Sequence, residues 1–265
     1  MNKLLITGAS GFVGTALCRI AINRGFSVLG MQRQASSTAS FESLVSDLSK
    51  TQSFDFLDRY SLDGIIHLAA NSDVNACENF PKESYLLNVV ASKNLATYAK
   101  KRNIPFVFAS SDQVFDGEKG NYSTQDQALP LNQYGKQKLE AENSCLASYT
   151  KSVVCRLPLM LGAHGGYEKN FIANLKEGKV QKLFTDEIRS VAQVDEIAKS
   201  LIEALSWGGG LYHLGGPKPM NRYEIGLYLA EKYHLASALL EPAKQADVSM
   251  AAARPKDVSM LSINP

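Results

Sequence analysis

The stretch Lys3-Leu4-Leu5-Ile6-Thr7-Gly8-Ala9-Ser10-Gly11-Phe12-Val13-Gly14 decides the fold of this 265-residue chain. Its first four residues have the apolar pattern of a buried strand, and residues 15–24 that follow have the pattern of a helix. The glycines between them permit a sharp turn and a close approach of the backbone to a pyrophosphate, which the first turn of the helix then faces. The spacing is Gly-x-x-Gly-x-x-Gly, and its strand-turn-helix context predicts a dinucleotide site, the alternative being a plain tight turn. The expected cofactor contacts here are Gly8, Ser10, Gly11, Phe12, Val13 and Gly14.

Short apolar runs alternate with helical stretches along the first part of the chain. Such alternation predicts βαβ units, and hence an α/β fold with a Rossmann-type doubly wound parallel sheet. The pattern loosens after Arg156, ahead of a glycine-containing loop at 161–166 and a helix expected at 170–177. We therefore expect a dinucleotide-binding Rossmann domain at 1–155, and at 156–265 mainly a smaller substrate-binding lobe with segments that return to the Rossmann domain. The strands are expected at 3–6, 27–30, 64–68, 106–109 and 152–155.

Composition narrows the class of protein. The chain is 45% hydrophobic and 20% charged, and its net charge of +2 gives no reason to expect a nucleic-acid partner. Neither a signal peptide nor an apolar run long enough to span a membrane is found, so a cytoplasmic protein is expected. The cysteines are scattered without Cys-x-x-Cys spacing, which favours reduced core thiols over a metal site or disulfides. They are Cys18, Cys77, Cys145 and Cys155.

A candidate for proton transfer lies at the start of a later helix. Tyr134 and Lys138 are four residues apart, so their side chains share one helix face. An ammonium beside a phenol favours the phenolate and brings the tyrosine pKa toward the working pH. The pair alone is a weak signal, since both residues are common on solvated helix faces. A strand at 106–109 that ends in Ser110 and Ser111 strengthens it, because ligands of open α/β sheets bind beyond the carboxyl ends of strands.

Together these segments resemble the extended short-chain dehydrogenase/reductase family over nearly the whole chain. Within it, Ser-Ser-Asp-Gln-Val-Phe-Asp-Gly at 110–117 and Pro-Leu-Asn-Gln-Tyr-Gly-Lys-Gln-Lys at 130–138 are most similar to motifs of dTDP-4-dehydrorhamnose reductases and their sugar-nucleotide relatives. The resemblance implies that Tyr134 donates a proton as hydride arrives from the nicotinamide, and that Ser111 polarises the substrate carbonyl. It implies that Lys138 lowers the tyrosine pKa and bonds the nicotinamide ribose. Asn88 matches the family's helix asparagine, although a structural role is equally open.

The choice of cofactor is predicted from the end of the second strand. NAD-selective folds place an acid there for the ribose 2′-hydroxyl, whereas this chain has Gln32. Arg33 follows, and a guanidinium with the nearby Ser36 hydroxyl suits a 2′-phosphate. NADPH is therefore expected over NADH, the alternative being a solvated arginine. By resemblance, other cofactor contacts are Asp47 and Leu48 beside the adenine, and Leu68, Ala69 and Ala70 behind a ribose.

The substrate class is predicted from two arginines. Arg189 and Arg254 resemble residues with which epimerases of the family hold the diphosphate of a nucleotide sugar, the alternative for each being a surface arginine. Ser111, Asp112 and Asn170 complete the expected substrate contacts. The chain lacks the aromatic stretch that the rhamnose-pathway reductases carry after their sixth strand, so a different sugar is open.

The leading prediction is thus an NADPH-dependent reductase of a 4-keto sugar nucleotide. Two alternatives stay open: a non-catalytic family member that binds a nucleotide and regulates a partner, and a sugar-nucleotide epimerase or dehydratase. Retention of the serine, tyrosine and lysine together favours the enzyme, and fold alone does not decide. A homodimer is possible. The sugar, the nucleotide base and the direction of the reaction are left open.

Overall fold

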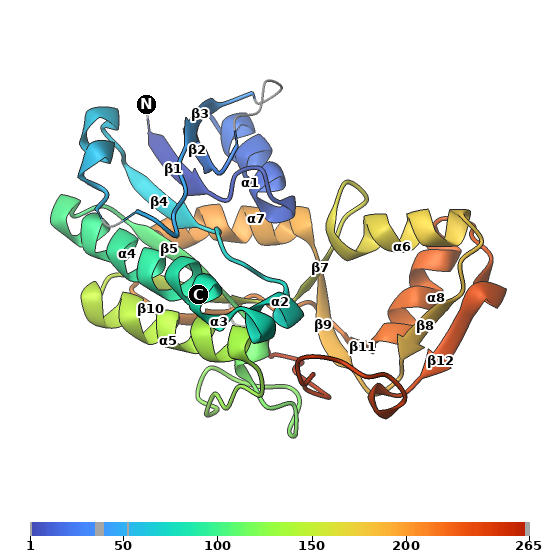
Figure 1. The fold of residues 1–265 in the computed structure, drawn as a ribbon. Helices are drawn as coiled ribbons and strands as arrows, with labels where there is room; N and C mark the ends of the chain where they lie inside the picture. Colours follow the sequence, from blue (N-terminus) through green and yellow to red (C-terminus); the bar gives the residue numbers. More distant parts are fainter. Residues whose placement is uncertain (1, 35–39, 52, 263–265) are drawn as a thin grey trace.

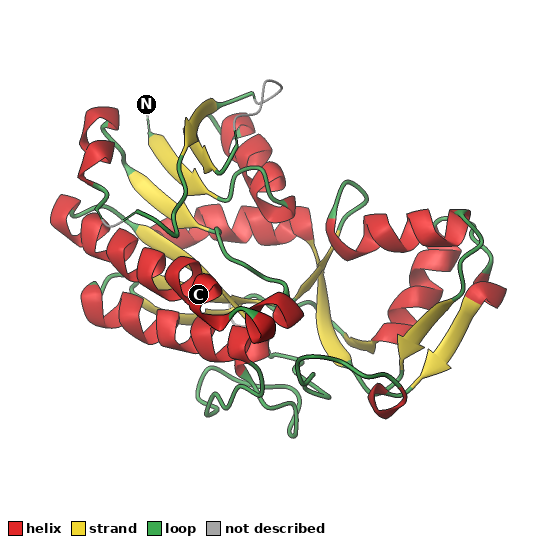
Figure 2. Ribbon diagram, viewed as in Figure 1, coloured by secondary structure: helices red, strands yellow, loops and turns green. Residues whose placement is uncertain are grey.

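The computed structural model describes residues 2–34, 40–51 and 53–262. Its centre is a parallel sheet of seven strands (Figure 1, Figure 2). In spatial order these are β10 (Gly210–His213), β6 (Val153–Leu157), β5 (Phe106–Ser111), β4 (Gly64–His67), β1 (Lys3–Thr7), β2 (Ser27–Gln32) and β3 (Glu42–Val45). The order reverses beside β1, so the doubly wound Rossmann-type sheet is confirmed. Sequence patterns predicted five of these strands; β3 and β10, short edge strands, were not predicted.

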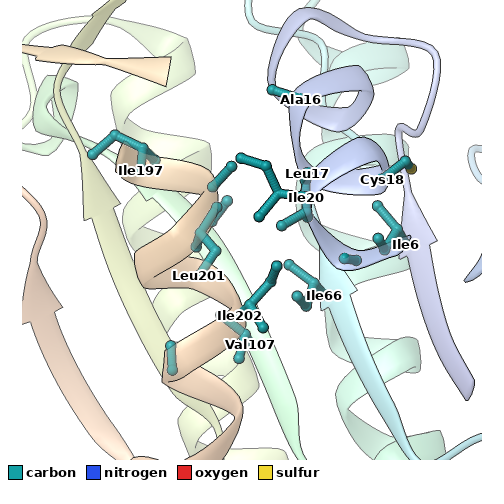
Figure 3. Packing of buried hydrophobic residues seen from close by; sticks show 14 of the residues in the cluster. Ile6, Ala16, Leu17, Cys18, Ile20, Ile66, Val107, Ile197, Leu201 and Ile202 are labelled. Atoms are coloured by element: carbon teal, nitrogen blue, oxygen red, sulfur yellow. The ribbon is translucent and has the colours of Figure 1, made fainter. Parts of the chain in front are cut away.

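One face of the sheet is covered by α1 (Phe12–Asn23) and α7 (Val194–Glu203). Figure 3 shows how their apolar side chains meet over the sheet: Leu17 and Ile20 from α1, with Leu201 and Ile202 from α7. All four are less than one tenth exposed. Although α7 lies in the later part of the chain, it completes the core around β1, β4 and β5. The two parts of the chain therefore share one core.

The other face of the sheet is covered by α4 (Ala91–Arg102) and α5 (Gln133–Ser148), with a 3₁₀ segment at Asp55–Tyr60. Short helices α2 (Val74–Asn79) and α3 (Pro81–Tyr85) and a π-helical turn (Leu86–Val90) lead into α4. The remaining 3₁₀ turns are Asp112–Val114, Ala204–Ser206, Ser237–Leu239 and Gln245–Asp247. Among the described helices none is long and apolar enough to cross a bilayer.

A smaller lobe stands beside the sheet, on the right of Figure 1. It contains α6 (Gly166–Lys176), α8 (Arg222–Lys232) and a parallel pair of strands, β8 (Gln181–Phe184) and β12 (Leu240–Ala243), around a core of its own. A three-stranded sheet joins it to the rest: β7 (Leu159–Leu161), β9 (Ile188–Gln193) and β11 (Pro219–Asn221). α6 begins at Gly166, before the expected start at residue 170. The glycines there favour a loop, but the residues that directly follow them pack on the lobe, and so the helix begins earlier.

Candidate functional site

A cavity of about 1360 Å³ is lined by the carboxyl ends of the central strands and by residues of the lobe. Most of the residues predicted from the sequence line it. They are Gly8, Ser10, Gly11, Phe12, Val13, Gly14, Arg33, Asp47, Leu48, Leu68, Ala69, Ala70, Ser111, Asp112, Tyr134, Lys138, Arg189 and Arg254. Asn88 and Asn170 are not among the lining residues, and Ser36 lies outside the described residues. A single cavity thus joins the predicted cofactor, catalytic and substrate residues.

The glycine loop has the geometry that a dinucleotide requires. Gly8 has φ +69°, a left-handed conformation, and its N–H donates to the Met31 carbonyl at 2.9 Å. A Cβ on Gly14 would lie 2.1 Å from the Gly8 oxygen, so no side chain fits there. Gly11 is the N-cap of α1 and makes no side-chain cap bond, which leaves the helix N–H groups for an anion. These residues fit a bound pyrophosphate.

A buried hydrogen-bond chain supports the strand β4 edge of the same site. The Thr7 hydroxyl oxygen accepts from the N–H groups of Leu68 and Ala69, both at 3.1 Å. It lies 2.6 Å from Nδ1 of His67, whose Nε2 lies 2.9 Å from the Ser92 hydroxyl. Burial lowers the pKa of His67 to about 3, so the ring is neutral and can accept at one nitrogen and donate at the other. These hydrogen bonds fix the position of Leu68 and Ala69, which are expected to lie behind a ribose of the cofactor.

The two side chains at the end of β2, Gln32 and Arg33, carry no negative charge that would repel a phosphorylated ribose. Gln32 is buried, its Nε2 donates to the Ser43 hydroxyl at 2.8 Å, and its Oε1 has no partner among the described residues. Arg33 is exposed and lines the cavity, as do Asp47 and the buried Leu48. No carboxylate replaces Gln32 at the strand end, so a 2′-phosphate meets no acid at that position.

The first turn of α5 determines the position of the proton-transfer residues. Asn132 caps this helix, because its Oδ1 accepts from the Gly135 N–H at 2.9 Å, and its Nδ2 donates to the Ala253 carbonyl at 3.0 Å. A Cβ on Gly135 would lie 2.2 Å from the Gln113 oxygen, so the helix packs directly on the segment after β5. This close packing explains the Asn-x-x-Gly spacing and brings Tyr134 beside the end of β5.

Tyr134 and Lys138 are both buried and have opposite pKa shifts. Burial lowers the pKa of Lys138 to about 8; its Nζ donates to the Ala109 carbonyl at 2.7 Å and lies 4.0 Å from the centre of the Phe108 ring. Burial raises the pKa of Tyr134, an effect that the Ser111 hydroxyl opposes. The lowered tyrosine pKa expected from the neighbouring ammonium is therefore not found, because desolvation is the largest effect on the phenol and raises its pKa. Tyr134 keeps its proton at neutral pH, as a donor must.

The two serines after β5 have different partners. Ser110 donates to Glu142, a buried residue that also pairs with Arg156 at 2.7 Å, so its hydroxyl is engaged in the core. The Ser111 hydroxyl lies 3.2 Å from Oδ1 of Asp112 and accepts from the Gln113 N–H at 3.2 Å. It can release Asp112 and donate to a substrate oxygen, and this difference favours Ser111 as the polarising group.

The two asparagines that do not line the cavity have other surroundings. Asn88 is buried in the π-helical turn, where its side chain accepts from the Asn71 N–H at 2.8 Å and donates to Oε1 of Gln137 at 2.9 Å. It ties the loop after β4 to α5, and π-helical turns often occur at functional sites. Asn170 is exposed on α6.

An alternating chain of charges occupies the lobe side of the cavity. Arg189 pairs with Asp112 at 2.8 Å and with Glu187 at 3.0 Å, and Glu187 also pairs with Arg222 at 2.8 Å. Burial would raise the pKa of Glu187, but the two arginines hold it at about 2. Arg254 also lines the cavity and donates to Oδ1 of Asn75 at 3.0 Å.

Sequence reasoning missed Arg222 and Tyr167, which line the same cavity. Arg222 is the first residue of α8, after the capping residue Asn221, and Tyr167 lies in the first turn of α6. In the sequence both are ordinary helix-start residues. No local pattern distinguishes them, because their position depends on how α6 packs against β7 and α8 against β11.

Comparisons with known proteins agree with this geometry. The family model for the RmlD substrate binding domain matches residues 1–264. The chain belongs to that family. It is of the extended short-chain dehydrogenase/reductase type, whose members include NAD(P)-dependent oxidoreductases, and the resemblance stated from the motifs is confirmed.

Two curated relatives cover most of the chain. A probable low-salt glycan biosynthesis reductase, Agl14, of Haloferax volcanii is 29% identical over 260 residues, which cover 95% of this chain and 87% of that protein. Methionine adenosyltransferase 2 subunit beta of Xenopus laevis is 32% identical over 258 residues, which cover 91% of this chain and 75% of that protein. This RmlD family member is thus similar both to a named reductase and to a named subunit.

Solved structures share the fold of this RmlD family member. A dTDP-4-dehydrorhamnose reductase from Bacillus anthracis in complex with NADP has a TM-score of 0.88 at 21% identity, over 99% of this chain and 92% of that one. MoeE5 in complex with UDP-glucuronic acid and NAD has a TM-score of 0.81 at 23% identity, over 98% and 89%. These complexes contain NADP in one case and NAD in the other.

Proposed function

We propose that this protein reduces a keto group of a nucleotide sugar with NADPH. The observation that carries the proposal is that one cavity joins the glycine loop, the Ser111–Tyr134–Lys138 group and a cluster of arginines. A bound reduced nicotinamide dinucleotide supplies the hydride. Gly8, Gly11 and Gly14 would hold its pyrophosphate, and Lys138 its nicotinamide ribose. The 4-keto position is proposed from the motif resemblance.

Each catalytic side chain has one role. Ser111 donates to the carbonyl oxygen and withdraws electron density from the carbon that accepts the hydride. Tyr134 gives its proton to that oxygen, so no free alkoxide forms in the buried site. Lys138, held by the Ala109 carbonyl, keeps a positive charge near the tyrosine as its proton leaves. Asn88 acts indirectly, because its side-chain hydrogen bonds connect the loop after β4 to α5, the helix that carries Tyr134 and Lys138.

NADPH is proposed over NADH from two residues. Gln32, which replaces an acid at the end of β2, does not repel a 2′-phosphate, and Arg33, which lines the cavity, supplies a guanidinium. The Rossmann domain at 1–155, the lobe at 156–265, the cytoplasmic location and the homodimer stay predictions from the sequence.

The proposal is tested by a panel of substrates. Purified protein is mixed with NADPH, or with NADH, and with dTDP-, UDP- and GDP-linked 4-keto sugars, and loss of the reduced cofactor is followed at its absorbance. We expect turnover of at least one keto sugar, with NADPH preferred. Tyr134→Phe serves as the background control. Oxidation of neither cofactor with any keto sugar would contradict the reductase.

A second function rests on a different observation, the 32% identity to a named subunit of methionine adenosyltransferase 2. In that alternative the protein binds a nucleotide and regulates a partner enzyme without turnover. The substrate panel separates the two, since only the reductase consumes reduced cofactor. An epimerase or dehydratase would convert a sugar nucleotide with no net consumption of added NADPH.

A further inference from the structure

Three polar side chains lie in one row across the central sheet, on the face that α5 covers. Ser110 of β5 is in register with Arg156 of β6, and Arg156 is in register with His213 of β10. Successive side chains of a strand point to opposite faces, so Ser110 shares a face with the core residue Phe108 and points away from its neighbour Ser111. All three side chains of this polar row are buried.

Glu142 of α5 connects two members of the polar row. Its carboxylate accepts from the Ser110 hydroxyl and from two nitrogens of Arg156, Nε at 3.0 Å and Nη2 at 2.7 Å. The third nitrogen of Arg156, Nη1, lies 3.4 Å from Nε2 of His213, whose Nδ1 lies 3.1 Å from the Tyr122 carbonyl. Burial lowers the pKa of His213 to about 4, so its ring is neutral and can accept from the arginine. Every nitrogen of the guanidinium thus has a partner.

The Glu142–Arg156 ion pair is costly where it lies. Its side chains are 3% and 4% exposed, and the removal of two charges from water is unfavourable. Apolar side chains of similar volume often stabilise a fold as well or better, whereas a fully bonded ion pair permits few other arrangements of the groups around it. Here the pair determines the geometry of the strand end, because its carboxylate binds Ser110 and the next residue of the strand is Ser111.

The same carboxylate lies on the helix face that carries Tyr134 and Lys138. These two residues and Glu142 follow one another at intervals of four along α5, and all three are buried. Burial lowers the pKa of Lys138 to about 8, and the negative charge of Glu142 opposes that effect. The charges of Asp112, after β5, and of Arg189, on β9, act on Tyr134. Glu142 therefore acts on the lysine of the pair.

Four other described side chains contact the Lys138 ammonium or act with it electrostatically, and all four are uncharged at neutral pH. Burial raises the pKa of two of them, which are thiols, and lowers that of a histidine to about 3, while the fourth is an aromatic ring. They are Cys145 on α5, Cys77 on α2, His67 on β4 and Phe108 on β5. Of these five groups Glu142 alone is ionised, and Arg156 on β6 offsets part of its charge.

We propose that Glu142 is a positioning residue for the proton-transfer group: through Ser110 it fixes the strand end that carries Ser111, and through its charge it helps Lys138 to stay protonated. The role in proton transfer rests on the proposed function. Glu142 is not among the residues that line the cavity, so it acts through these neighbours and not on a substrate.

The first test is Ser110→Ala, which removes the hydroxyl and leaves the ion pair in place. We expect kcat for the keto sugar to fall about 10-fold, because a small displacement of Ser111 misplaces its hydroxyl, while KM changes little. The matched control is Ser152→Ala. Ser152 is also a buried serine that bonds α5, through the Cys145 carbonyl at 3.2 Å, but it does not line the cavity. Both variants should lower the melting temperature, and only Ser110→Ala should lower kcat.

The second test is Glu142→Gln, which removes the negative charge and keeps an oxygen for the Ser110 hydroxyl. Without that charge the ammonium is less favoured, so the titration of Lys138 should move to lower pH by about 1 unit, and the descending side of the kcat/KM profile should move with it. NMR of protein with isotope-labelled lysine follows this titration without substrate, and Lys138→Met assigns the signal. The matched control is Glu140→Gln, on the exposed side of α5, which should leave both unchanged.

The outcomes separate this inference from the reductase. An unmoved lysine titration in folded Glu142→Gln, or equal kcat in Ser110→Ala and Ser152→Ala, overturns the inference and leaves the reductase standing. If Glu142→Gln does not fold, the comparison of the two serine variants decides. If the wild type oxidises neither cofactor with any keto sugar, the reductase fails and the role in proton transfer fails with it, whereas the lysine titration still decides whether Glu142 acts on Lys138.

Discussion

Lys138 and Arg189 are buried to a similar degree in one cavity, yet their charges have different partners. The described contacts of the Lys138 ammonium are neutral, the Ala109 carbonyl and the face of Phe108. Arg189 instead contacts two carboxylates, on Asp112 and Glu187. As a result burial lowers the pKa of the lysine to about 8, whereas the carboxylates raise that of the arginine above its usual value.

The difference teaches that burial of a cation does not by itself identify a ligand-binding group. The lysine charge is not neutralised by a direct contact, so it can act on a cofactor hydroxyl or on the tyrosine. The arginine charge is neutralised locally and joins the lobe strand β9 to the segment after β5. A family motif points to both residues equally; their contacts separate a reactive role from a positioning one.

The largest expected effect tests the reactive side of this comparison. Tyr134→Phe keeps the ring but removes the proton, so the rate of keto-sugar reduction should fall by about 10²–10⁴-fold. NADPH affinity should be unchanged, because the ring still fills its place and Lys138 still has the Ala109 carbonyl. Stopped-flow rates and fluorescence titration of NADPH measure the two. Full activity in this variant would mean that another group is the acid.

A pair of stability measurements tests the contrast directly. Arg189→Met leaves Asp112 with an unpaired buried charge, so the free energy of unfolding should fall by about 3–5 kcal/mol. Lys138→Met removes a buried charge that no carboxylate of the described residues contacts directly, at the loss of one neutral hydrogen bond, so the change should be about 1 kcal/mol or less. Urea denaturation of both variants gives the values. Equal losses would show that the two cations stabilise the fold alike.

A smaller effect is expected at the end of β2, where a cation is exposed. Arg33→Ala should weaken NADPH binding by about 1.5–3 kcal/mol, the range for a hydrogen bond to a charged group, and change NADH binding little. Gln34→Ala, at the next position along the cavity, is the matched control. Isothermal titration with both cofactors provides the measurement. Equal losses for NADPH and NADH would remove the 2′-phosphate assignment.

The pH profile should show the smallest change, about tenfold per pH unit on its descending side. Lys138 loses its charge as pH rises through about 8, so kcat/KM should fall above that pH. Folding stability should change the other way: between about pH 8 and 10.4 the unfolded chain binds the proton more tightly, so this group favours the folded state as pH rises. If Lys138→Arg is active, its descending side should move above pH 10. A fall that stays near pH 8 in that variant would exclude Lys138 as its origin.

The two halves of the cavity differ in how many of their residues and properties can be predicted from the sequence. The glycine loop, Tyr134 and Lys138 are predictable because each depends on residues within a few positions: a strand, a turn and a helix start. The pKa of Tyr134 was not predicted correctly, since the expected ammonium effect is local and the desolvation comes from the whole surrounding fold. Arg189 was found by its motif, but its two carboxylate partners were not considered.

The sequence by itself determined the alternation of strands and helices, the dinucleotide turn and the Tyr-Lys spacing, because periodicity and glycine conformation act over short stretches of chain. Only the tertiary structure decided which side chains the arginines contact. Arg222 and Tyr167 lie on α8 and α6, and Arg254 lies near the end of the chain, yet all three line one cavity. The side-chain partners of the two arginines are 35 or more residues away in the chain, at Glu187 for Arg222 and Asn75 for Arg254. Charge compensation depends on distance in space, and the packing of the lobe against the sheet sets those distances.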